Sequence, residues 1–147
     1  MSELAVIKDI LRQQITGYQA LREVLQKERR CLVDLKASEI EELSKKKDLI
    51  LMRLRLLEEE RIRIIERFRK KIKTKKDINL RRLYEITGDE ELLKLRSELL
   101  SLIQVISELN DFNRILIDRS LSYVRSASFL LDSHGINAPQ HSLSREA

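Results

Sequence analysis

The residue types that most often carry catalysis are few in this sequence of 147 residues, and they lie apart. Both histidines, His134 and His141, come at or after the end of the last predicted helix, and Cys31 is the one cysteine. A catalytic site needs convergent groups of matched pKa, and a metal site needs several ligands, so neither is expected. Glycine-rich phosphate loops and the HExxH zinc motif are absent from the sequence. We therefore predict a protein that is not an enzyme and has no cofactor or metal.

Cys31 lies beside the apolar seam of the first predicted helix, which indicates a small, half-buried apolar residue. A reactive thiol is the alternative, because Arg29 and Arg30 are close. A single cysteine excludes an intramolecular disulfide, so nothing favours an oxidising compartment. The first residues lack the pattern of a secretory signal, and no apolar run of about 18 residues could span a membrane. We expect a cytoplasmic protein.

The composition predicts helices. Charged residues make up 36% and apolar residues 42% of the chain, while glycine (3), proline (1) and aromatic residues (4%) are scarce. This balance is typical of long amphipathic helices, and the length suits a single domain.

The apolar spacing predicts two long helices, at about 3–35 and 39–73. In the first, Leu4, Leu11, Tyr18, Leu25 and Leu32 share one heptad position. A second heptad position of this helix is also mostly apolar, but Gln14 and Glu28 interrupt it. These interruptions favour a bundle over a strict two-stranded coiled coil. The run from Ser38 to Glu41 has the spacing of a capping box and predicts the start of the second helix. The short linker between the helices favours an antiparallel hairpin.

A third long helix is predicted at about 89–134, after a short helix near 79–86 and a break at Thr87-Gly88. Gly135 has the place of a residue that follows a helix cap, and the residues beyond it lack periodicity. The predicted fold class is all-α: an antiparallel bundle of three long helices with a short connecting helix over 1–135, and a flexible C-terminal tail over 136–147.

Positive charge gathers between residues 61 and 82, where eleven lysines and arginines face two acids. Such a segment can contact nucleic acid, anionic lipid or an acidic protein, although a solvated helix end is the simplest interpretation. The candidate basic contact patch is Arg67, Arg69, Lys70, Lys71 and Lys73.

The third long helix carries two apolar stripes. Leu109, Phe112, Leu116, Tyr123 and Leu130 share one side, which we expect to face the core. A second stripe is formed by Ile117, Leu121, Val124 and Leu131. This helix is either sandwiched in the bundle or in a homodimer, so that both stripes are buried, or the second stripe is a docking surface for an amphipathic segment of another protein.

Two segments resemble the FlgN-type flagellar export chaperones: residues 109–123 (LNDFNRILIDRSLSY) and residues 32–47 (LVDLKASEIEELSKKK), which look like the C-terminal helix and a helix junction of that family. The resemblance implies a cytosolic chaperone of flagellar type III secretion that binds the terminal helices of hook-associated proteins, keeps them unassembled and presents them to the export gate. It places partner binding on Ile117, Leu121, Val124 and Leu131, with Tyr123 and Leu130 beside them.

Two other functions stay open from the sequence. One is a structural or regulatory coiled-coil component of the secretion apparatus, which would work through the long hairpin and the basic segment. The other is a basic helical protein that binds nucleic acid, which the scarcity of aromatic residues near the basic segment makes the weaker hypothesis. A small-molecule substrate is not expected, and any membrane contact would be peripheral.

Overall fold

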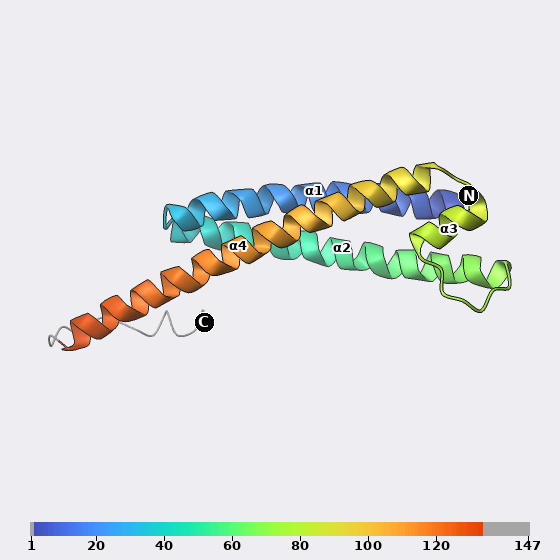
Figure 1. Ribbon diagram of the computed structural model, residues 1–147. Coiled ribbons are helices and arrows are strands. Elements are labelled where there is room, and N and C mark those ends of the chain that lie inside the picture. The colour runs from blue at the N-terminus through green and yellow to red at the C-terminus, as the bar shows by residue number, and fades with distance from the viewer. Residues whose placement is uncertain (1, 134–147) are drawn as a thin grey trace.

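The computed structural model describes residues 2–133 and contains four α-helices (Figure 1). Their bounds are α1 (Glu3–Val33), α2 (Ala37–Lys71), α3 (Leu80–Thr87) and α4 (Glu91–Ser133). No strand occurs among these described residues. The predicted all-α class, with three long helices and a short connecting one, is confirmed. The predicted tail and Gly135 lie outside the described residues.

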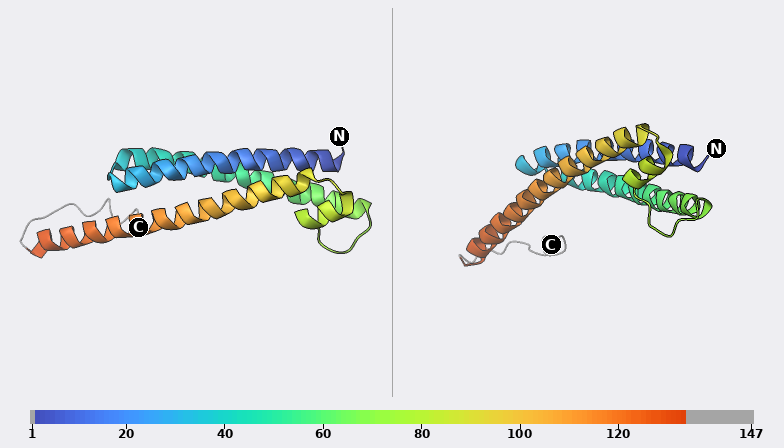
Figure 2. Two further views of the ribbon diagram at one scale, coloured as in Figure 1. Left: turned by 45° about the horizontal axis from the view of Figure 1, so that its top comes forward. Right: turned by 45° about the vertical axis from the view of Figure 1, so that its right-hand side comes forward.

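Helix α1 is the centre of the bundle because it packs against both α2 and α4. The helices α1 and α2 form an antiparallel hairpin, and α4 runs in the same direction as α1. Residues near the start of both helices pair, as Lys8 does with Asp89, and Glu28 and Asn113 meet farther along. Figure 1 shows α4 crossing the hairpin, and both views of Figure 2 show it continuing past the turn that joins α1 to α2.

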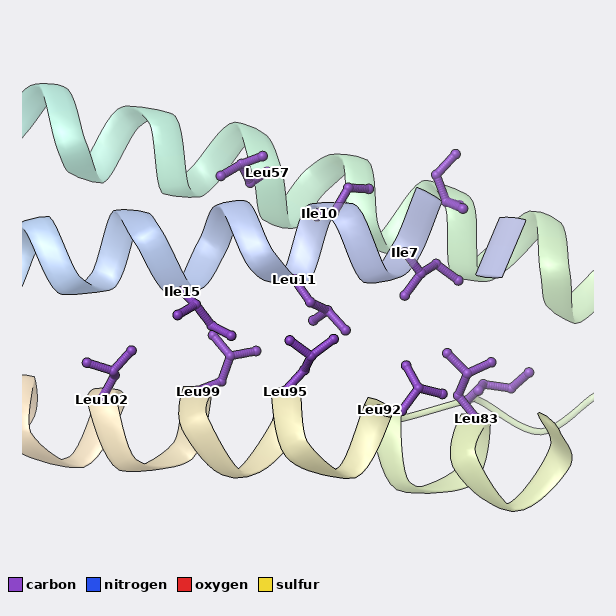
Figure 3. Packing of buried hydrophobic residues seen from close by; sticks show 12 residues of the cluster. Ile7, Ile10, Leu11, Ile15, Leu57, Leu83, Leu92, Leu95, Leu99 and Leu102 are labelled. Carbon is purple, nitrogen blue, oxygen red and sulfur yellow. The ribbon is translucent and has the colours of Figure 1, made fainter. Parts of the chain in front are cut away.

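The main hydrophobic core lies at the end of the bundle where α3 closes it (Figure 3). Ile7 and Leu11 of α1 face Leu92 and Leu95 of α4, and Leu83 anchors the short helix α3 in the same cluster. Within α1 and within α4 the two named residues are four or three positions apart, a spacing that places them on the same face of the helix. Two smaller clusters continue the core between α1 and α2 toward their turn, one around Leu25 and Leu54 and the other around Val24 and Leu43.

Both helices of the hairpin end earlier than predicted, through the same backbone motif. After α1, Leu35 has a φ of 56°, and the N–H of Lys36 donates to the carbonyl of Cys31 over 3.0 Å. After α2, Lys73 also has a φ of 56°, and the N–H of Thr74 donates to the carbonyl of Arg69. This six-to-one bond with a left-handed residue is the Schellman motif, which satisfies carbonyls that the helix leaves free.

The predicted capping box at the start of α2 is wrong. The helix begins at Ala37, its N-cap is Lys36, and no side chain caps it. Ser38 therefore lies inside the first turn, because the Schellman turn at Leu35 already fixes how the chain enters α2.

The predicted break at Thr87-Gly88 is confirmed. Gly88 ends α3 with a φ of 69°, a left-handed conformation that glycine adopts without steric cost. Its N–H donates to the carbonyl of Tyr84 over 2.7 Å, and the side chain of Asn79 caps the other end of α3 by accepting from the N–H of Arg82.

Candidate partner-binding surface

The second half of α4 projects beyond the hairpin. Asn113 is the last buried residue of this helix, and no side chain from residue 114 to residue 133 is buried. Figure 1 shows this part of α4 continuing past the turn between α1 and α2. The projecting segment, residues 114–133, therefore has no helix of the bundle covering it along its length.

The stripe Ile117, Leu121, Val124 and Leu131 continues the face that α4 buries in its first half. At about 100° per residue, all four lie within about 60° of Leu99 on the helix circumference. The buried residues Leu92, Leu95 and Leu102 occupy the same sector. In the first half of α4 this face packs against the core that α1 shares. Beyond Asn113, Ile117 and Leu131 are exposed and Leu121 and Val124 half-buried, and none of them joins a core cluster of residues 2–133.

The stripe expected to face the core is wrong for three of its residues. Phe112 is 41% exposed, Tyr123 73% and Leu130 57%. Leu109 and Leu116 are half-buried. The side of α4 that is buried in its first half is therefore the side on which the second stripe lies, because the position of α1 selects the side of α4 that packs.

Tyr123 and Leu130, the two neighbours named with the stripe, are widely exposed on an adjacent side of the projecting segment. Phe129, which sequence reasoning did not select, is exposed as well. The projecting segment is apolar over much of its circumference, and such a surface is characteristic of an interaction site.

A buried polar cluster marks the point where α4 leaves the hairpin. The Nδ2 of Asn113 donates to Oε1 of Glu28 and to the carbonyl of Leu25, each over 3.0 Å. The other oxygen of Glu28 accepts from Nζ of Lys47 on α2, also over 3.0 Å. Three helices are therefore joined by one carboxylate, whose charge a lysine balances. We call Glu28, Lys47 and Asn113 the polar lock.

The polar lock explains why Glu28 interrupts the heptad pattern of α1. Sequence reasoning missed Asn113, although a polar residue on the buried face of a helix is the signal that could have found it. Gln14, the other interruption, is also buried and donates to Oε2 of Glu58 over 2.8 Å, while Arg61 pairs with the second oxygen of Glu58. Both interruptions are thus polar contacts between helices, which favour one register of packing over others.

Ion pairs hold the start of α4 against α1. Nζ of Lys8 lies 2.8 Å from Asp89 and 3.3 Å from Glu91, and Arg12 also pairs with Glu91. Hydrogen bonding to Lys8 lowers the pKa of Asp89, and hydrogen bonding to Arg12 and Lys8 lowers the pKa of Glu91. The same contacts raise the pKa of Lys8. Together with the polar lock, they fix α4 at both ends of its packed half.

The predicted basic contact patch lies at the other end of the molecule from the projecting segment, where α2 ends (Figure 1). Two of its five residues are engaged in contacts within the protein. Arg69 is engaged by Glu66 and by the carbonyl of Thr74, and Lys71 pairs with Glu3. Arg67, Lys70 and Lys73 are exposed, and none of them has an ion pair within residues 2–133.

Cys31 is buried near the turn of the hairpin, and its Sγ donates to Oε2 of Glu39 over 3.3 Å. Burial and this hydrogen bond raise the pKa of the thiol, so its reactive thiolate form is disfavoured. This setting fits a packing role rather than a nucleophile. In the described part of the chain, no cluster of histidine, cysteine, aspartate and glutamate side chains has the arrangement of a metal site. Nor does any helix there carry an apolar stretch of the length needed to cross a bilayer.

Comparison with known protein families gives a match over most of the chain. The family described as FlgN protein matches residues 1–136, which is most of the chain and includes the hairpin and all of α4 that the structure describes. No curated protein and no solved structure matches the chain significantly.

Proposed function

Because this chain belongs to the FlgN family, whose members are flagellar export chaperones of type III secretion, we propose that it binds hook-associated flagellar proteins through the projecting segment of α4. The protein acts in the cytoplasm, where it holds the terminal helices of these partners and prevents their assembly before export. The chaperone then presents the bound protein to the export gate.

One observation carries the proposal: the face of α4 that packs on the core in its first half continues along Ile117, which is exposed, and Leu121 and Val124, which are half-buried. None of the three belongs to a hydrophobic core cluster of residues 2–133. A helix of the partner that lies on this face takes the place that α1 occupies along the first half of α4. Amphipathic helices bind such surfaces by burying residues at a spacing of three or four. Burial of each large aliphatic side chain contributes about 1.5–3 kcal/mol before the costs of association.

The contact needs no folding of the chaperone around its partner. The polar lock and the ion pairs at Lys8 fix the first half of α4, so the projecting segment leaves the bundle in a defined direction. A helix that is presented in this way loses less conformational freedom on binding than a disordered segment does. Leu131, Tyr123 and Leu130 widen the contact toward the end of the segment.

Binding of a purified hook-associated protein to Leu121→Asp and Val124→Asp tests the proposal. We expect each variant to weaken binding at least about tenfold, which corresponds to about 1.4 kcal/mol, because an unpaired charge would be buried in the contact. The helix content and the melting temperature should stay near those of the wild type, since both side chains are only half-buried in the free protein and lie outside the core clusters.

Ile115→Asp is the matched control, because Ile115 is exposed on the opposite side of the same segment. It should bind the partner as the wild type does. Unfolding of the Leu121 and Val124 variants would show that the stripe is core, and unchanged binding by both would place the contact elsewhere. If wild-type protein at working concentration is a homodimer that the two variants abolish, a second copy rather than a partner covers the stripe.

A further inference from the structure

A cluster of lysines lies where α2 ends, far from the projecting segment. Residues 70–76, which we call the lysine turn, contain five lysines and no acid. All five side chains are exposed. Lys71 lies 2.5 Å from the carboxylate of Glu3, and no other lysine of the turn has an ion pair with a residue that the structure describes. The lysine turn therefore presents an uncompensated positive charge at one end of the molecule.

The lysine turn has a defined backbone. Lys73 takes the left-handed conformation of a Schellman motif, and the Nη1 of Arg69 donates to the carbonyl of Thr74 over 2.8 Å. Arg69 is held in turn by Glu66, to which its Nε donates over 2.9 Å. Because the turn is fixed in this way, Ile72 stays 39% exposed in the middle of the lysines.

We propose that the lysine turn binds the surface of an anionic membrane, with its lysines near the lipid phosphates and Ile72 at the interface. Each lysine near such a surface raises the partitioning of the protein from water onto the membrane about fivefold. This attraction does not require a shaped pocket. Lysine side chains are flexible, so those of an exposed turn can reach phosphates that have no fixed arrangement on the lipid surface. A single exposed aliphatic side chain among them adds a weak apolar contact with the boundary of the acyl chains.

The same residues fit nucleic acid less well. Binding to single strands uses aromatic side chains on which bases stack, and the two aromatic residues near the turn, Phe68 and Tyr84, are partly buried against the core. The bidentate recognition of phosphate favours arginine, and the guanidinium of Arg69 is already occupied. Within residues 70–76 every cation is a lysine and Ile72 is the one large apolar side chain, which is the composition that an anionic lipid surface can use.

This proposal does not depend on the proposed function, because it rests on residues at the other end of the molecule. Either surface can fail its test without consequence for the other. If both hold, the chaperone has one end for its partner and one end for the membrane.

Co-sedimentation of the full chain with vesicles tests the proposal. The vesicles contain phosphatidylcholine alone or phosphatidylcholine with about one-third phosphatidylglycerol, an anionic lipid. We expect binding to the anionic vesicles only, and a steep loss as salt rises from about 0.05 to 0.5 M, where screening shortens the reach of the charges. The triple variant K73E/K75E/K76E should bind at least about 100-fold more weakly. Its fold should be unaffected, because all three side chains are exposed outside the helices.

The matched control is K27E/K45E/K46E, which makes the same change in net charge near the hairpin turn, where these lysines are exposed among acids. It should retain most of the binding, whereas an equal loss in both triple variants would mean that only net charge matters and would overturn the proposal. Unchanged binding by K73E/K75E/K76E would also overturn it. So would tighter binding of the wild type to duplex DNA or single-stranded RNA than to the anionic vesicles at the same salt. If K73E/K75E/K76E does not fold, K73Q/K75Q/K76Q is measured in its place, with the same expectation of lost binding.

Discussion

Asn113 of α4 and Glu28 of α1 form a buried hydrogen bond of 3.0 Å at the point where α4 leaves the hairpin. Asn113 is 1% exposed and Glu28 3%, so this contact is shielded from water. On one side of it the apolar face of α4 packs into the core, and on the other side, up to residue 133, the same face has no buried side chain. Asn113 thus divides α4 into a half that packs on the bundle and a half that projects from it.

Asn113→Ala should destabilise the protein. The substitution leaves Oε1 of Glu28 without its donor in a buried setting, which costs about 1–3 kcal/mol. The free energy of unfolding from urea denaturation measures the loss. Asn110→Ala is the control, because it makes the same change at an exposed position one turn away and should shift the free energy of unfolding by less than about 0.5 kcal/mol. Equal shifts in the two variants would contradict a structural role for the polar lock.

The stability of the bundle should fall in acid, partly through the start of α4. The pKa values of Asp89 and Glu91 are lowered in the folded protein by their hydrogen bonds to Lys8 and Arg12. Carboxyl groups with lowered pKa values stabilise the folded state above the ordinary carboxyl range near pH 4, and this contribution is lost as pH falls through their folded pKa values. The melting temperature should therefore drop below about pH 5.

In the double variant Asp89→Asn with Glu91→Gln, this drop should be shallower, because neither neutral side chain titrates. A residual slope should remain from Glu3 and Glu66, whose pKa values are also lowered, by Lys71 and Arg69. Glu90→Gln is the control, since Glu90 is exposed between the two acids and has no ion pair among the described residues. A melting profile of the double variant that parallels the wild type at every pH would show that the ion pairs at Lys8 add nothing to stability.

The sequence predicts the number and type of the helices because their apolar residues recur with helical spacing over many turns. It does not predict where the hairpin helices end. The left-handed residue after α3 is Gly88, which the sequence shows. After α1 and α2 the same conformation is taken by Leu35 and Lys73, whose residue types do not indicate it. Both turns carry a six-to-one hydrogen bond to the preceding helix, although the left-handed conformation is unfavourable for residues other than glycine.

The buried side of α4 could not be chosen from periodicity alone. Between residues 109 and 131 this helix is apolar on several sides, so that two stripes satisfy the helical spacing. The contact with α1 decides which stripe lies on the buried side. Asn113 takes part in that contact, but as a polar residue it belongs to neither apolar stripe. The candidate residues Ile117, Leu121 and Val124 continue the packed face of α4 outside the core clusters of residues 2–133, but their role as a binding surface stays a prediction.

Hydrogen exchange should divide α4 at the polar lock. Residues 92–109 pack against the core, so their amides should open only with large-scale unfolding. Residues 114–125 lack this cover, and their backbone hydrogen bonds should open locally and exchange at least about tenfold faster. Mass spectrometry of peptides from the two stretches measures the contrast and leaves out the last turns of the helix, which fray in any case. In Asn113→Ala the fast-exchanging stretch should extend toward Ile106, because the contact that ends the packed half is lost. Uniform protection along α4 would mean that the projecting segment is covered in solution, and the surface proposed for the partner would then be occupied in the free protein.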